Sequence, residues 1–329
     1  MKQPINLLKI FLIIPLLSCL SQAPLHGQQF YRPLDTLDLS FFISGIAANI
    51  LPKDRIEILT YSTLNSYWLA VHESGQHSPV RDRLRVTNFV ATLEGYFGFS
   101  KSQRWDLGLR LQYTRFHQDN EARSSPFRVF QSTSETEIGN QMDPTYHGLN
   151  SVGARLRFMP IPSVPSLTLN GGYTLAVIKS EDEAKRRSLN ADRDIADLGI
   201  AYYIDLNPNT YYYFLANTSV WLPGGFDNKW QYNSSVSFFL VHLAFGQKLV
   251  LYPGLSYNLT YQPPVYGKKF LVKTSDQLLA YAGIQFQPST SFSINGSLAF
   301  PLILNNSNLF FEQVRNSYTL VSIGLRVML

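Results

Sequence analysis

The sequence of 329 residues has little charge, a single cysteine and almost no long apolar run. Charged residues make up 16% of the chain, against roughly 25% in soluble globular proteins. One cysteine excludes a scaffold of intrachain disulfides. The only long apolar run, Leu7 to Leu17, is too short for a membrane-spanning helix, which excludes a helical membrane protein. Aromatic residues, in contrast, reach 14%, too many for a disordered chain.

Residues 1–27 have the pattern of an export signal. Lys2 and Lys9 precede the apolar run Ile10–Leu17, and a polar stretch follows it. Two forms of processing are open. Ordinary cleavage after Gly27 would remove the signal, whereas a lipoprotein box ending at Cys19 would make that cysteine a lipidated N-terminus.

The mature chain is nearly neutral. Removal of the two lysines in residues 1–27 leaves 26 basic residues against 23 acidic ones. No basic stripe suggests nucleic acid, which an exported protein would not meet, so no nucleic-acid partner is expected.

Beyond residue 54 the chain repeats a pattern of apolar and polar residues that alternate with period two. Successive side chains of a strand point to opposite faces, so this pattern predicts strands with one apolar face. In the third segment Trp105, Leu107 and Leu109 share one face, while Asp106 and Arg110 share the other. The twelve predicted strands are 55–72, 83–100, 104–117, 145–159, 166–179, 193–206, 210–222, 230–245, 248–261, 275–287, 290–300 and 317–329.

The connections between these segments alternate in length. Those after the even-numbered segments are short, and those after the odd-numbered ones are long: 73–82, 118–144, 180–192, 223–229, 262–274 and 301–316. Short periplasmic turns and long external loops are typical of outer-membrane barrels. The expected fold is therefore all-β, a single antiparallel transmembrane β-barrel of about 12 strands with both termini in the periplasm. A soluble β-sandwich or jelly roll, the alternative, would have shorter strands and no such alternation.

The expected organisation is a signal peptide at 1–27, an N-terminal segment at 28–54 and the barrel at 55–329. The middle segment is too short for a domain. It could be a periplasmic leader or a plug folded into the lumen. Among the loops, 118–144 could enter or cover the barrel, and the highly charged stretch from Ser180 to Asp194 is expected to be a solvated outer loop.

This pattern resembles Gram-negative outer-membrane barrels of about 300 residues, in particular the transporter barrels of the phenol-degradation-pathway type. The resemblance covers most of 55–329 and rests on the pattern, without a diagnostic motif. One departure is the terminal Leu329, where many such barrels have Phe or Tyr. The resemblance implies an outer-membrane location, a passive route for small or apolar molecules, and contacts with outer-membrane lipid, lipopolysaccharide and the barrel-assembly machinery.

Charged residues on the predicted lumen faces are the main candidate site. They could discriminate among solutes by charge, or they could fill a polar interior with ion pairs. Period two places inward Glu94, Asp106, Arg110, Arg155, Arg157, Asp197, Asp205 and Arg326.

Two further constellations are weaker. Four histidines at the first two external loops could form a metal or pH-sensing site, although rim histidines are common: His72, His77, His117 and His147. A His-x-Ser pair, His72 and Ser74, resembles the catalytic element of outer-membrane lipid hydrolases, with Asn88 as a third member. No phosphate loop, zinc spacing or calcium loop is present in the sequence, so no cofactor or metal is expected.

The expected function is a passive channel or transporter for small solutes or small apolar molecules, and not an enzyme. The alternative is an outer-membrane protein that transports nothing: a scaffold, an adhesin or an accessory subunit of a membrane complex with an unknown partner. Lipid hydrolysis by His72 and Ser74 is a minor alternative.

Overall fold

The computed structural model describes residues 50–72, 80–119, 125–131, 145–178, 183–189, 193–223, 230–262, 272–306 and 311–329. All of them belong to one compact unit, which spans Asp35–Leu329. The other unit, Met1–Leu34, lies outside the described residues, as does the predicted signal peptide.

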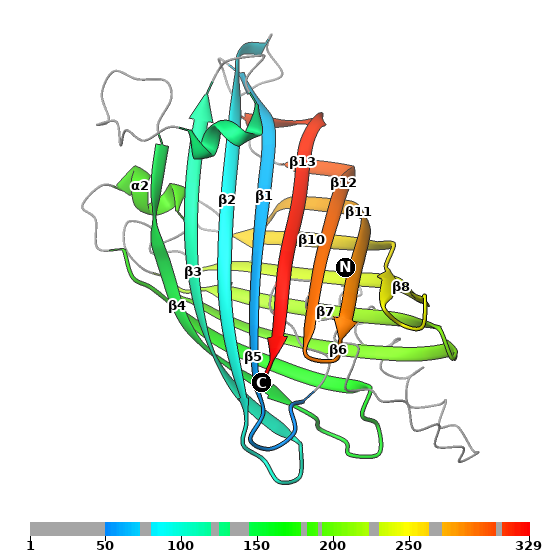
Figure 1. Ribbon diagram of the computed structural model, residues 1–329. Coiled ribbons are helices and arrows are strands. Elements are labelled where there is room, and N and C mark those ends of the chain that lie inside the picture. Colours follow the sequence, from blue (N-terminus) through cyan, green and yellow to red (C-terminus); the bar gives the residue numbers. More distant parts are fainter. Residues whose placement is uncertain are drawn as a thin grey trace, which may run out of the picture. The chain divides into compact units, whose positions relative to one another are not determined.

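Antiparallel strands form one sheet that closes on itself (Figure 1). Each strand pairs with its neighbours in the chain, and the last strand pairs with the first. The strands are β1 (Ile56–His72), β2 (Val80–Gly98), β3 (Trp105–Asp119), β4 (Thr145–Phe158), β5 (Leu167–Ala176), β6 (Ile195–Asn207), β7 (Thr210–Trp221), β8 (Gln231–Ala244), β9 (Leu249–Leu251), β10 (Gly254–Gln262), β11 (Val272–Ser289), β12 (Phe292–Asn306) and β13 (Phe311–Met328).

The thirteen segments make a barrel of twelve strands, because β9 and β10 are two parts of one strand. Both pair with β8 on one side and β11 on the other. Pro253 separates them, since it has no N–H to donate to the ladder. The backbone hydrogen bonds to the strands on both sides continue through this point: Tyr252 N donates to Gly283 O on β11 at 2.9 Å, and Leu240 N on β8 donates to Pro253 O at 3.0 Å. The predicted twelve-stranded antiparallel barrel is confirmed.

The last two strands correct the predicted loop lengths. They were expected at 290–300 and 317–329 with a long loop between them, but β12 and β13 leave only residues 307–310. The predicted strand ended at residue 300, directly before Pro301. Instead the strand passes through it, and a register shift in the pairing of β11 with β12 accommodates the irregularity.

The faces of the strands follow the predicted alternation. On β3 the side chain of Leu109 is 72% exposed, whereas Asp106 on the opposite face is fully buried. On β13 the side chain of Ile323 is 60% exposed, whereas Arg326, which lies three residues later and on the opposite face, is buried. The exposed apolar side chains form the outer surface of the barrel, which is the arrangement that contact with lipid requires.

In the described parts of the longer connections there are two short helices. The 3-10 helix η3 (Pro126–Phe130) packs on the outer face, where the Phe130 ring is 4.8 Å from that of Phe89. The helix α2 (Glu183–Ser188) is followed by Leu189, which is fully buried against inward-facing side chains that include Phe116 and Tyr146. The stretch expected to be a solvated loop is thus anchored at the mouth of the barrel. No helix among the described residues is long and apolar enough to cross a membrane.

Candidate functional site: the inner face of the barrel

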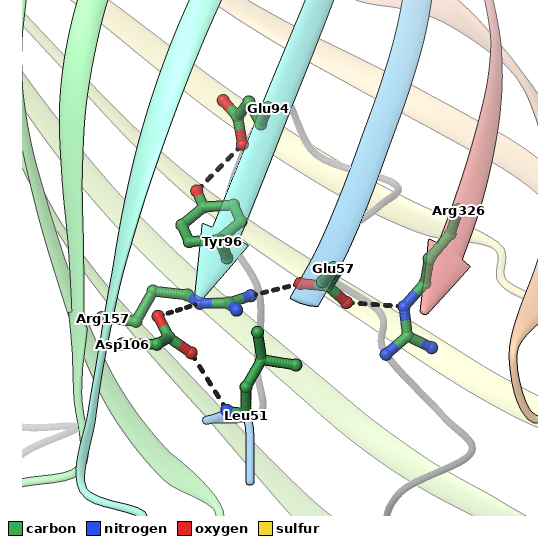
Figure 2. Close-up of polar contacts among 7 residues, drawn as sticks. All are labelled: Leu51, Glu57, Glu94, Tyr96, Asp106, Arg157 and Arg326. Atoms are coloured by element: carbon green, nitrogen blue, oxygen red, sulfur yellow. Dashed lines mark hydrogen bonds and ion pairs between the residues drawn. The ribbon is translucent and has the colours of Figure 1, made fainter. Parts of the chain in front are cut away.

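Buried ion pairs link β13, β1, β3 and β4 at the end of the barrel that has the short turns. Glu57 accepts hydrogen bonds from Arg157 Nη1 at 2.9 Å and from Arg326 Nε at 2.6 Å (Figure 2). Arg157 Nε also donates to Asp106 Oδ1 at 2.6 Å. Glu57 and Asp106 are 0% exposed and Arg157 is 1% exposed. Such charges are stable in the interior only because each is paired and hydrogen-bonded.

Glu94 on β2 is the centre of a second group of polar contacts. Its Oε2 accepts a hydrogen bond from Tyr96 Oη at 2.9 Å, and its Oε1 accepts one from Tyr61 Oη at 3.2 Å. Arg110 Nε lies 3.4 Å from Glu94 Oε1, and Arg155 Nε lies 4.0 Å from it. The guanidinium of Arg155 also pairs with Asp197 on β6. Together these contacts extend the network from β1 to β6.

The two groups meet at Tyr96. The guanidinium carbon of Arg157 lies 3.8 Å from the centre of the Tyr96 ring, a cation–π distance. Gly108 on the neighbouring strand makes room for this ring, because a Cβ there would lie 2.5 Å from Tyr96 Cδ1. The ion pairs, the two tyrosines and this stacked pair therefore form one continuous set of contacts, called here the charged network.

The structure brings seven of the eight predicted lumen charges into this network: Glu94, Asp106, Arg110, Arg155, Arg157, Asp197 and Arg326. Asp205 lies elsewhere, exposed near the turn that ends β6. Sequence reasoning missed Glu57, Tyr61 and Tyr96. A usable signal for Glu57 was its position in the first alternating segment, where it shares a face with Leu59.

Four carboxylates and four guanidinium groups give the network no net charge. Arg110 has the most exposed side chain of the four arginines, at 14%, so it is the one best placed to meet a solute.

Substituting Arg110 by alanine should therefore leave one excess negative charge on the inner face. We expect the reversal potential in a salt gradient to shift towards cation selectivity. Arg104→Ala is the control, since Arg104 binds the carbonyl oxygens of Met159 and Pro160 at a short turn. Unchanged selectivity would show that Arg110 serves packing alone.

An apolar cluster occupies the inner face of the strands from β6 to β11. Two of its aromatic members pack over glycines of neighbouring strands, Phe239 over Gly254 and Tyr252 over Gly283. All members are at most 4% exposed, so they fill space at this level of the barrel: Ala201, Tyr211, Tyr213, Leu215, Phe239, Val241, Leu243, Val250 and Tyr252.

Residues just before β1 close against the charged network. Leu51 N donates to Asp106 Oδ2 at 3.0 Å, and its side chain, 3% exposed, packs against Leu59 and Tyr96. Asp54 N donates to Gly98 O at 2.7 Å. The end of the predicted 28–54 segment is thus fixed to the barrel. Residues 28–49 lie outside the described residues, so whether they form a leader or a plug stays a prediction.

The histidine constellation is only partly described. His117 is buried on the outer face, with Nδ1 2.8 Å from Thr145 Oγ1 and Nε2 3.3 Å from Asp119 Oδ2. The ring of His147 lies 6.4 Å from that of Tyr113. Among the described residues no three potential ligands are grouped to hold a metal ion. His77 lies outside the described residues.

The position of Asn88 argues against its role as the third residue of the predicted hydrolase site. His72 pairs with Val80, and Asn88 lies eight residues further along β2, a separation of about 26 Å. Asn88 therefore lies far along the sheet from the position of His72 in the chain. Ser74 lies outside the described residues.

Comparison with known proteins supports the fold. No family model matches the sequence, and no curated protein does. Among solved structures, the chain is similar to an outer membrane channel from Pseudomonas putida F1, with 11% identity, 86% of this chain and 98% of that chain covered, and a TM-score of 0.57. The β domain of the Bordetella autotransporter BrkA (12% identity, 82% and 98% covered, TM-score 0.48) and a mutant of the TodX monoaromatic hydrocarbon channel (9%, 88% and 93%, 0.44) are less similar.

At these identities the likeness concerns the fold alone. It agrees with the closed antiparallel barrel and its apolar outer surface, and the chain has the fold of an outer-membrane β-barrel. The side of the membrane on which its ends lie stays a prediction.

Proposed function

We propose that the protein is a passive outer-membrane channel for small uncharged molecules, apolar ones included. The observation that carries this proposal is the distribution of charge on the inner face. The inward-facing residues of the described parts of β7 to β11 are uncharged, and the buried inward charges of the other described strands are paired in the charged network, with Asp205 exposed near a turn. A solute that crosses such an interior meets little excess charge.

The apolar cluster limits what can pass. Its side chains are in contact with one another, and a wide water-filled bore would leave them wetted. We therefore expect low ion conductance, and passage of solutes that are small enough to move past rotating side chains. The similar fold of the channel from Pseudomonas putida F1 agrees with a transport role, at the level of fold.

Liposome swelling tests this function. The full-length protein, reconstituted after purification, should admit glycerol and erythritol faster than lysine or glutamate. Absence of swelling with every solute, together with no conductance from folded protein, would contradict a channel and favour the scaffold or accessory-subunit alternative.

A matched pair of variants on β7 tests whether solutes pass through the apolar cluster. Tyr213 points inward and is 1% exposed, while its neighbour Phe214 points outward and is 39% exposed. Tyr213→Ala should open space in the apolar cluster and raise the rate of erythritol entry several-fold. Phe214→Ala removes an equally large ring from the outer surface and should leave the rate unchanged. Equal rates for both variants would place the path elsewhere.

A further inference from the structure

Neutral hydrogen-bonding side chains form a continuous surface on the inner face, next to the apolar cluster and towards the long connections. Four of them are direct partners on adjacent strands: Asn217 on β7, Ser235 on β8, Asn258 on β10 and Gln277 on β11. The next row on the same face repeats the chemistry with Ser219, Asn233, Thr260 and Ser275. We call these two rows the amide wall.

The first row continues across Gly199 to β5. Gly199 pairs with Asn217 on one side and with Asn170 on the other. A Cβ at Gly199 would clash with the amides of both asparagines, and would lie 2.6 Å from Asn170 Oδ1. The glycine thus lets the two amides lie over the backbone of β6. As a result, five amide or hydroxyl side chains of the first row, Asn170 included, line one inner surface.

One hydrogen-bonding group of this row is unused. Asn170 is 6% exposed, and its Nδ2 has no hydrogen-bond partner in the described part of the chain. A buried amide nitrogen without a partner is uncommon and costly in a folded protein. The side chains of Asn217, Ser235 and Gln277 are half-buried and point into the barrel. These three side chains, in contrast to the buried Asn170, are partly accessible to a molecule inside the lumen.

The chemistry of the wall selects a ligand class. Amides and hydroxyls both donate and accept hydrogen bonds, and here they are repeated at about 4.8 Å from strand to strand. A neutral molecule with several hydroxyl groups can satisfy many of them at once. The charge next to the wall, Asp197, which is the partner of Ser219, is already paired with Arg155. A charged solute would therefore lose hydration without meeting an opposite charge that is free to bind it. Trp221, the partner of Gln231 in the following row, adds an aromatic surface beside the amides.

We propose that the amide wall is a binding site for a small neutral saccharide. The site rests on the proposed function in one respect, since the sugar must enter the lumen to reach it. Binding itself does not require passage, so the two can be tested separately.

Calorimetric titration of the full-length protein with maltose tests the site, in a zwitterionic detergent that has no sugar headgroup. We expect saturable binding of maltose and at least about tenfold weaker binding by the triple variant Asn217→Leu, Ser235→Val, Asn258→Leu, because several hydrogen bonds are lost. Maltobionate, the carboxylate analogue, should bind more weakly than maltose.

The control changes the same strands on the outer face. Ser234 and Thr218 are the outward-facing neighbours of Ser235 and Asn217, and the variant Ser234→Val, Thr218→Val should bind maltose like the original protein. The heat-dependent shift of folded barrels in gel electrophoresis shows whether each variant has assembled. If the triple variant does not assemble, the single variant Asn258→Leu takes its place, with an expected loss of a few-fold.

Three results would overturn the site: no saturable binding of maltose, equal affinity in the assembled wall variant, or equal affinity for maltobionate. Glycerol swelling separates this inference from the proposed function. Glycerol entry without maltose binding would support the proposed channel function and contradict the saccharide site. Maltose binding without glycerol entry would support the site and contradict the channel.

Discussion

Replacing Glu57 by alanine is expected to destabilise the barrel by about 3–5 kcal/mol, because it leaves two buried guanidinium groups without their shared carboxylate. Arg157 is 1% exposed and Arg326 is 4% exposed, so water cannot replace the lost partner without rearrangement. Glu57 also joins β13 to β4 through ion pairs. Its removal therefore divides the charged network where the barrel closes.

Urea unfolding of the reconstituted protein measures this effect. Glu57→Gln should give an intermediate loss, since the amide oxygen still accepts a hydrogen bond from one arginine. Asp205→Ala is the control, because Asp205 is an exposed carboxylate outside the network. A loss of less than about 1 kcal/mol for Glu57→Ala would mean that the ion pairs contribute little to stability.

A methyl group at Gly283 is expected to have the second largest effect, a destabilisation of about 1–3 kcal/mol from overpacking. A Cβ at this position would overlap the ring of Tyr252, which is 1% exposed and whose Oη donates to Gly296 O at 3.0 Å. The ring cannot move away without losing this hydrogen bond and disturbing Phe239, whose ring centre is 6.4 Å away.

Comparison of Gly283→Ala with Gly95→Ala isolates the steric cause. Both glycines lie within strands, but a Cβ at Gly95 would have no heavy atom within 4 Å. Gly95→Ala should therefore leave the urea midpoint unchanged. Adding Tyr252→Leu to Gly283→Ala should recover part of the loss, because the smaller side chain clears the new methyl group. If the double variant is no more stable than expected from the sum of the single changes, the contact with Tyr252 is not the cause.

Much of the barrel was predictable because the pattern that encodes it is local. Alternation with period two assigns each side chain to a face from its own strand alone, and that was sufficient for Leu109 outside and Asp106 inside. The alternation of short and long connections gave the antiparallel order. The same rule identified seven of the eight charges that the structure places in the network.

The local structure at irregular positions was harder to predict from the sequence, since it depends on residues of neighbouring strands across the sheet. Pro253 interrupts a strand that its neighbours still hold in register, whereas Pro301 lies within a continuous strand. Leu189, in a charged stretch, is buried because Phe116 and Tyr146 lie beneath it. None of these surroundings is visible in the adjacent sequence.

The sequence by itself therefore determined the fold class, the strand number and the face on which each regular side chain lies, since these follow from a periodicity within single strands. Only the tertiary structure decided which inward residues meet. Closure of the sheet places Glu57 on β1 between Arg326 on β13 and Arg157 on β4, and register across six strands, from β5 to β8, β10 and β11, aligns the amide wall with Asn170. Those contacts depend on strand stagger and closure, which belong to the whole barrel and to no single segment.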